Sequence, residues 1–376
     1  MRYRVLNLAF LAVFLMSLVV SSQPVSAQIT GDPGVRGGHA MVYDPHNQVM
    51  VMYGGFTEPA GVGETDETWF YDYATNTWTE HVGTTPPARR AAMVYCNETN
   101  EIIMYGGSER FDTWSFDPLT QTWFQVITAA NPGVHYEHGM AYDPQQNAVI
   151  LFGGFGADGD ARDDTWKFDC TTREWTELNP TASPMARYGF VMAYDDTIEQ
   201  IILSCGNTAT GHKDDTWTYD YDADTWTEVD TTGTPGELKW ARMTYDSLNQ
   251  RMVLFGGEYT TTVDATKIYN AQEETWTNAA PEDAPVARIV TAMAFDSNNG
   301  VIIIYGGIDS DWANLGDTWA YEYSTNTWTD MNTVTGATTS STTQPPEMIP
   351  LELLVIGVAV PVAIVVVVVV LKTKTK

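Results

Sequence analysis

Four closely spaced carboxylates lie in one short polar segment, residues 156–164, which reads GADGDARDD. Oxygen ligands in a glycine-containing loop can wrap a hard cation such as calcium. The candidate ligands are Asp158, Asp160, Asp163 and Asp164. The segment lacks the twelve-residue loop with a closing Glu, and a solvated acidic turn accounts for the same residues. A calcium site is therefore one of two interpretations.

Basic residues recur at a fixed distance before an aromatic residue. Arg36, Arg187 and Arg288 each stand seven positions before the aromatic residue that ends an apolar run. The related positions elsewhere hold Arg89 or Arg90, His135 and Lys239. These side chains either tie neighbouring elements together through carbonyls or an Asp, or form a site for an anionic ligand.

Other chemistry is scarce in this sequence. It has no glycine-rich phosphate loop, no G-x-S-x-G elbow, no HExxH motif and no serial Ser/His/Asp pattern, and we expect no cofactor unless calcium is bound. The net charge of −29 disfavours nucleic acid as a partner because an acidic surface repels phosphates. Three cysteines leave at least one thiol unpaired, and their positions predict no disulfide framework.

The elements that must position these residues come from a repeat of about 50 residues. Its first copy holds two apolar runs, HAMVY and QVMVMY, a diglycine at Gly54 and Gly55, and two strands that each carry a Trp. Diglycines or their equivalents recur six times in steps of 47 to 52 residues, and a closing Trp recurs with them. An earlier Trp precedes the closing one by nine positions, except in the fifth copy, where Lys267 stands. Four strands per copy predict a small antiparallel sheet that must stack on its neighbours.

This pattern resembles the kelch-repeat family. The shared features are the diglycine that ends the second strand, an aromatic-Asp strand such as Tyr71-Asp72, and the Trp strand that follows. The resemblance covers about 300 of the 376 residues. It implies an all-β fold, a six-bladed β-propeller over residues 28–331, like the central domain of galactose oxidase-like proteins. The Tyr/His cluster and Tyr-Cys link of the copper-radical oxidases cannot be assembled here.

The two ends of the chain have a different composition. Two Arg and an apolar run precede Val25-Ser26-Ala27, which predicts a signal peptide over residues 1–27. Residues 332–347 form a Thr/Ser/Pro-rich stalk, and residues 348–371 predict a transmembrane helix with the uncharged core Leu353–Leu371. Three Lys in the tail, residues 372–376, predict a cytoplasmic C-terminus and an extracellular propeller.

These features favour a cell-surface module that binds an extracellular protein or glycan and has no chemistry of its own. The alternative is an enzyme of acidic sugars, such as a mutarotase or epimerase, with an Arg-lined axial pocket. A spacer in a surface lattice is a third possibility. We expect a negatively charged ligand on the face that joins the diglycine loops to the basic ring. The candidate binding residues are Arg36, Arg89, Arg187, Arg288, Tyr188, Trp240, Phe155 and Trp312, with Phe56, Phe111 and Tyr259 around the mouth.

Overall fold

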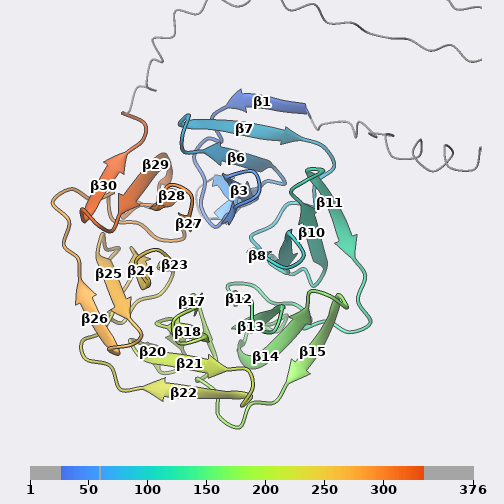
Figure 1. Cartoon of the computed structure of the whole chain (residues 1–376), viewed down its shortest axis with the longest axis vertical. Coiled ribbons are helices and arrows are strands. Elements are labelled where there is room, and N and C mark those ends of the chain that lie inside the picture. The colour runs from blue at the N-terminus through green and yellow to red at the C-terminus, as the bar shows by residue number, and fades with distance from the viewer. Residues whose placement is uncertain (1–26, 59–60, 334–376) are drawn as a thin grey trace, which may run out of the picture. The chain divides into compact units, whose positions relative to one another are not determined.

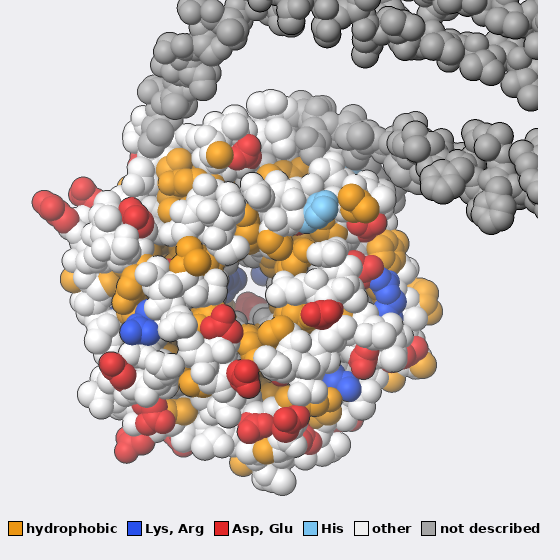
Figure 2. Space-filling model, in the orientation of Figure 1, with side chains coloured by type: hydrophobic (Ala, Val, Ile, Leu, Met, Phe, Trp, Pro, Cys, Tyr) orange, Lys and Arg blue, Asp and Glu red, His pale blue; other side chains and the backbone are white. Residues whose placement is uncertain are grey.

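The computed structural model describes residues 27–58 and 61–333, and this part of the chain contains no α-helix. Its strands form six antiparallel sheets arranged as blades around a central axis (Figure 1). The space-filling view shows an opening at the centre of the ring, with acidic side chains around it on the face drawn (Figure 2). The expected all-β kelch-type propeller is confirmed.

Each blade is built from four strands that follow one another from the axis outwards. Blade 1 contains β2 (Ala40–Asp44), β3 (Val49–Tyr53), β6 (Thr68–Asp72) and β7 (Thr77–Val82). Blade 2 contains β8 (Ala92–Cys96), β9 (Glu101–Tyr105), β10 (Thr113–Asp117) and β11 (Thr122–Val126). Blade 3 contains β12 (Gly139–Asp143), β13 (Ala148–Phe155), β14 (Ala161–Asp169) and β15 (Glu174–Leu178).

The second half of the propeller repeats this plan. Blade 4 contains β17 (Val191–Asp195), β18 (Gln200–Ser204), β21 (Thr216–Asp220) and β22 (Thr225–Val229). Blade 5 contains β23 (Arg242–Asp246), β24 (Arg251–Phe255), β25 (Thr266–Asn270) and β26 (Thr275–Asn278). Blade 6 contains β27 (Ala292–Asp296), β28 (Val301–Ile308), β29 (Asn314–Glu322) and β30 (Thr327–Asp330).

Short strands extend the loops of two blades. In blade 1, β4 (Phe56–Glu58) pairs with β5 (Val62–Glu64). Near blade 4, three short strands form a further small sheet: β16 (Arg187–Tyr188), β19 (Asn207–Thr208) and β20 (Gly211–His212). Four of these short strands, β4, β5, β19 and β20, follow a diglycine or its equivalent, in the loops that the sequence shows to vary, whereas β16 lies in the segment before β17.

Burial decreases from the inner strands to the outer ones. Four of the five residues of β3, which reads VMVMY, are buried, because this strand has a blade on each side. The outermost strand β22 instead buries Trp226 and exposes Thr227 and Glu228. A buried Trp among exposed polar residues is the pattern of a strand at the solvent-facing edge of a sheet.

Neighbouring blades are joined through the closing Trp of each copy. The indole nitrogen of Trp123 donates a hydrogen bond of 3.0 Å to the hydroxyl of Thr68 in blade 1, and its ring lies 5.3 Å from that of Tyr53. Trp226 makes the same contacts with Thr165 and with Phe152 of blade 3. We expected the closing Trp to pack on the next blade. That expectation is wrong, because the closing Trp of each outer strand packs against the blade that precedes it.

The ring closes between blade 6 and blade 1 without an exchanged strand. Trp78 of blade 1 donates to Thr318 of blade 6 and packs 4.7 Å from the ring of Tyr305. In addition, β1 (Ala27–Gly31) pairs with β7 and adds a fifth strand to the outer edge of blade 1. We expected that residues 28–35 could add a strand to a sheet edge, and the strand Ala27–Gly31 does so at the outer edge of blade 1.

The predicted terminal segments lie largely outside the described residues. These are the signal peptide up to residue 26, and the stalk, membrane helix and tail from residue 334 onwards. Where the structure describes the chain, it shows no helix of the length and apolarity needed to cross a membrane.

Candidate functional site

The recurring basic residues are buried and paired with carboxylates. Arg89, Arg187 and Arg288 have no exposed surface, and Arg36 is 1% exposed. Each donates from its guanidinium to an acidic side chain at 2.5 to 2.7 Å; the acceptors are Glu67, Asp112, Asp215 and Asp317. In blade 3 His135 takes the same place, with Nε2 3.1 Å from Asp164. The four guanidinium groups are therefore occupied inside the blades and do not face the mouth as ligand donors.

In five of the six blades the earlier Trp of the copy completes this arrangement. The indole nitrogen of Trp217 donates to Asp215 at 2.9 Å, while Arg187 donates to both oxygens of the same carboxylate. Burial alone would raise the pKa of Asp215, but the hydrogen bond and charge of Arg187 outweigh it and hold the pKa below its ordinary value. Matching indole bonds of 2.7 to 2.9 Å come from Trp69, Trp114, Trp166 and Trp319. We call each such set a basic–acid–Trp triad.

Blade 5 has no such triad. Leu238, which is 5% exposed, stands where the other blades place Arg or His. Ala265 replaces the carboxylate, and Lys267 replaces the Trp. We expected Lys239 to be the basic residue of this blade. Instead Lys239 lies one position further along, where its ammonium pairs with Glu258 at 3.1 Å and lies 4.0 Å from the ring of Trp240.

The expected aromatic residues fall into two groups. Phe155 stacks on Tyr188 with ring centroids 4.0 Å apart and on Tyr136 at 5.0 Å, so loops of blades 3 and 4 meet in one aromatic stack. Trp312 is 56% exposed on a loop of blade 6. The remaining mouth residues divide in the same way: Phe56 is buried, whereas Phe111 and Tyr259 are exposed.

The four Asp of the predicted calcium loop do not converge. Asp158 pairs with Arg162 at 2.7 Å, whereas Asp164 is held by His135 and Trp166 in the triad of blade 3. Among residues 27–58 and 61–333, no three His, Cys, Asp or Glu side chains lie close enough together to hold a metal ion. The structure thus does not gather the candidate calcium ligands into one site.

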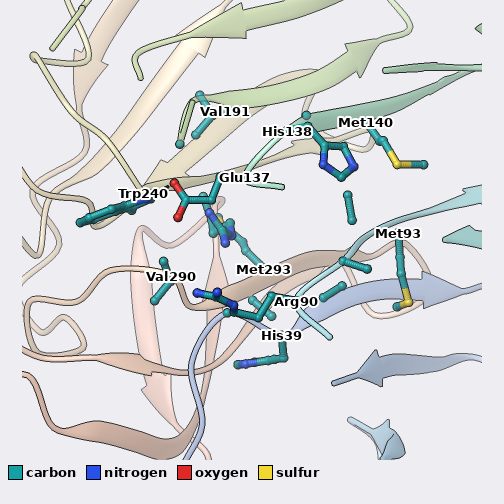
Figure 3. Close-up of a pocket in the computed structure, with 18 of the residues that line it drawn as sticks. His39, Arg90, Met93, Glu137, His138, Met140, Val191, Trp240, Val290 and Met293 are labelled. Atoms are coloured by element: carbon teal, nitrogen blue, oxygen red, sulfur yellow. Dashed lines mark hydrogen bonds between the residues drawn. The ribbon is translucent and has the colours of Figure 1, made fainter. Parts of the chain in front are cut away.

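A cavity of about 200 Å³ lies on the propeller axis and is lined by all six blades. Its wall includes one Met from each innermost strand: Met41, Met93, Met140, Met192, Met243 and Met293. Flexible thioether side chains adapt readily to apolar groups of different shape. At one end, charged and aromatic side chains from different blades approach one another, among them Arg90, Glu137 and Trp240 (Figure 3).

Backbone hydrogen bonds between blades position this end of the cavity. We define the axial segments as the four residues before each innermost strand: 36–39, 88–91, 135–138, 187–190, 238–241 and 288–291. Gly189 donates to Glu137 O, Trp240 to Gly189 O, Val290 to Trp240 O and Gly38 to Val290 O, at 2.7 to 3.1 Å. All five of these residues have positive φ, between 45° and 67°. In blade 2 the third residue of the axial segment is Arg90, whose backbone N–H donates to the hydroxyl of Ser108 at 3.1 Å. The described structure shows no bond from it to a neighbouring axial segment, so this backbone girdle skips one blade.

Gly189 has two reasons to be glycine. Its φ of 63° is in the left-handed region, which side chains disfavour. A Cβ there would also lie 2.8 Å from Cδ1 of Trp240. The indole can therefore lie flat against the backbone of blade 4, and its Nε1 donates 2.8 Å to Glu137 of blade 3. Three blades thereby fix one aromatic side chain at the rim of the cavity.

Two guanidinium groups remain at this end of the cavity. Arg90 pairs through Nε with Glu64 at 3.2 Å and lies over the ring of Phe56. Within residues 27–58 and 61–333, no hydrogen bond occupies its Nη atoms. Burial lowers the pKa of Arg242, and the charge of Glu137 partly offsets that effect. Both side chains line the cavity, so blades 2 and 5 each supply a guanidinium donor for a carboxylate.

Two histidines line the same cavity in the neutral state. Burial lowers the pKa of His39 well below its ordinary value, and the charges of Arg36 and Arg242 add to that effect. Burial, followed by the charge of His135, lowers the pKa of His138 to about 3. Both rings therefore stay uncharged at neutral pH, so the positive charge at the rim comes from the Arg side chains.

Sequence reasoning identified Trp240 and left out its neighbours. Glu137 stands at the same place in its axial segment as Trp240, and Arg242 begins an innermost strand. The residue type at both places changes from copy to copy, so neither shows in a search for recurring residues. Arg90 was named only as an alternative to Arg89 for the second copy. The ring of six Met did leave a signal, because a Met stands two positions before the aromatic residue in every copy.

Comparison with known protein families agrees with the architecture. Residues 109–282 match the KLHDC2/KLHL20/DRC7 kelch-repeats domain, and residues 293–335 match the kelch motif. Together the two matches cover more than half of the chain and run from the outer two strands of blade 2 to blade 6. The diglycines, the closing Trp and the six-bladed ring are the structural counterparts of these matches. The chain is a member of the kelch-repeat family.

Proposed function

We propose that this protein is a binding module that docks a protein partner on the face where the axial segments and diglycine loops meet. Kelch domains in general bind protein partners. The observation that carries the proposal is the axial cavity, whose rim holds Arg90, Glu137 and Trp240 from three different blades. Side chains brought together from separate repeats on a rigid ring are suited to recognition.

The chemistry of the rim favours a partner that presents a carboxylate beside an apolar group. Arg90 and Arg242 supply charged donors, and the indole of Trp240 supplies a flat apolar surface. The six Met below the rim offer an adaptable apolar wall for the neighbouring part of the ligand.

We further propose that the module acts outside the cell, held at the membrane by residues 348–371. The supporting features are the leader-like N-terminus, the Thr/Ser/Pro-rich segment and the uncharged run Leu353–Leu371. Deletion of residues 348–376 is expected to release the propeller into the medium. Membrane retention of the truncated chain would show that the N-terminal segment is the anchor and that it stays uncleaved.

The binding proposal is tested with a displayed library of random peptides selected on purified residues 28–335. We expect enrichment of peptides with Asp or Glu next to an apolar residue, and we expect Arg90→Ala with Arg242→Ala to weaken their binding at least tenfold. Arg251→Ala is the matched control, because Arg251 begins β24 at the opposite end of the blade. Selected peptides that bind the double variant as tightly as the wild type would overturn this site, and a glycan array serves to detect the sugar alternative.

A further inference from the structure

Two of the three cysteines meet in the core between blades 2 and 3. Cys96 ends β8, the innermost strand of blade 2, and Cys170 follows β14 in blade 3. They are 0% and 3% exposed, and their sulfur atoms lie 2.9 Å apart. Both belong to one apolar cluster that also contains Phe168 and Trp175. The two thiols are 74 positions apart in the sequence.

The third cysteine has a different environment. Cys205 replaces the first Gly of a diglycine in blade 4, and it is fully buried. Its sulfur lies 3.8 Å from the hydroxyl of Ser204 and 3.7 Å from the carbonyl of Gly236. No other cysteine contacts it within the described residues. Of the three possible pairs, the structure therefore favours only that of Cys96 with Cys170.

We propose that Cys96 and Cys170 form a disulfide bond that covalently joins blade 2 to blade 3. The sulfur atoms need to approach by less than about 1 Å to reach the bonding distance of roughly 2.05 Å. The inference does not rest on the proposed binding function, since it follows from the packing of two blades.

Formation of the bond consumes a disulfide oxidant such as oxidised glutathione. The thiolate of one cysteine attacks the oxidant and releases one glutathione thiol, which leaves a mixed disulfide. The second thiolate then attacks the protein sulfur and releases the second glutathione thiol. Two electrons and two protons thus pass to the oxidant. Because burial raises the pKa of Cys96 in the folded protein, we expect the exchange to occur before the core between the blades closes.

The position of the bond gives it a structural role. Blade 2 is the blade that the backbone girdle skips, so it lacks one of the links that hold the other five blades at the axis. A covalent link from the end of β8 to the residue after β14 joins blade 2 to blade 3 instead. A disulfide that closes a long loop also restricts the unfolded chain strongly.

The first test counts thiols in the full-length protein. The chain is refolded either with a mixture of oxidised and reduced glutathione or with dithiothreitol. It is then unfolded in the presence of N-ethylmaleimide, and its mass is measured by mass spectrometry. We expect one labelled cysteine after oxidative refolding and three after reduction, with a cross-linked peptide that contains Cys96 and Cys170. Three labelled cysteines in both samples, or a cross-link that includes Cys205, would overturn the proposal.

The second test separates the bond from a general effect of the reductant. Reduction is expected to lower the melting temperature of the wild type by about 5 °C. Cys205→Ala should keep this difference, and Cys170→Ala should abolish it. A reductant effect of equal size in Cys170→Ala and wild type would show that the bond does not form.

Discussion

Blades 4 and 5 have the same strand plan and nearly the same strand lengths, but only blade 4 contains a basic–acid–Trp triad. Blade 4 pairs Tyr219 with Trp226 across its outer strands, and blade 5 pairs Tyr269 with Trp276 in the same register. The triad is therefore not needed to form a blade. The inner strands and the closing Trp, which both blades share, are sufficient for that purpose.

The difference also shows that the triad residues of one blade can be replaced by other residue types. Blade 4 uses its axial segment to bury Arg187, whereas blade 5 uses an apolar Leu238 and places Trp240 and Arg242 around the cavity. A buried ion pair contributes little net stability compared with apolar packing of similar volume. Loss of the triad in one blade is therefore tolerated, and that blade supplies several of the side chains at the candidate binding site.

Removal of the closing Trp is the largest expected effect and should damage both blades. Trp226→Ala and Trp276→Ala should each lower the free energy of unfolding by about 3–5 kcal/mol. The cost in blade 4 should be the greater by about 1 kcal/mol, because Trp226 also packs 5.1 Å from the ring of Phe152. Urea unfolding monitored by fluorescence measures both values. A loss under about 1 kcal/mol in blade 5 would contradict the shared role of the Trp.

Breaking the triad of blade 4 should cost nearly as much. Asp215→Ala leaves the guanidinium of Arg187 buried without its carboxylate, and we expect a loss of about 3 kcal/mol. Asp222→Ala on the exposed turn of the same blade is the control and should have little effect. Equal urea midpoints for the two variants would mean that Arg187 finds another partner.

Copying blade 5 into blade 4 should recover most of that loss. The triple variant Arg187→Leu, Asp215→Ala and Trp217→Lys removes the charge together with its partners, so we expect a cost of only about 1 kcal/mol. The comparison with Asp215→Ala is made in the same urea series. A triple variant less stable than the single one would show that the blade 4 triad has a role that apolar packing cannot replace.

The triads should also make stability depend on pH in the acid range. The pKa of Asp215 is lower in the folded than in the unfolded state, so its ion pair contributes fully above the unfolded pKa of about 3.9. The contribution is lost as the pH falls further towards the folded pKa, because the unfolded chain binds the proton first. Urea midpoints measured from pH 6 to pH 3 should fall less steeply for Asp215→Asn than for wild type. Parallel curves would contradict the assignment.

The smallest expected effect is at the position where blade 5 lacks the Trp. Lys267→Ala should change the free energy of unfolding by less than about 0.5 kcal/mol. The reason is that Ala265 stands where the other blades place the carboxylate of the triad, so Lys267 has no triad partner. Trp217→Ala, at the matching position of blade 4, should cost more because it removes the indole donor to Asp215. Equal costs would show that this position matters only for its exposed surface.

The sequence by itself determined the repeat, the strands and their order from the axis outwards. Near-continuous apolar runs, diglycines and Trp-bearing strands are local patterns with a fixed period, and each copy repeats them. Their physical cause is the same in every blade: inner strands are covered on both faces and outer ones on one. The number of blades follows from the six copies. The absence of an exchanged strand follows because the first copy begins with its inner strand and the last ends with its outer one.

Only the tertiary structure decided how the copies contact one another. The partner of Arg187 lies 28 positions away, the closing Trp leans on the preceding blade, and Cys96 meets Cys170 from another blade. The rim of the cavity likewise combines Arg90, Glu137 and Trp240, which stand at the same place in their axial segments but differ in residue type, so no recurring residue marks them. A periodic pattern specifies what recurs within each copy. Contacts between different positions of different blades depend on the rotation of one blade against the next, which the period does not encode.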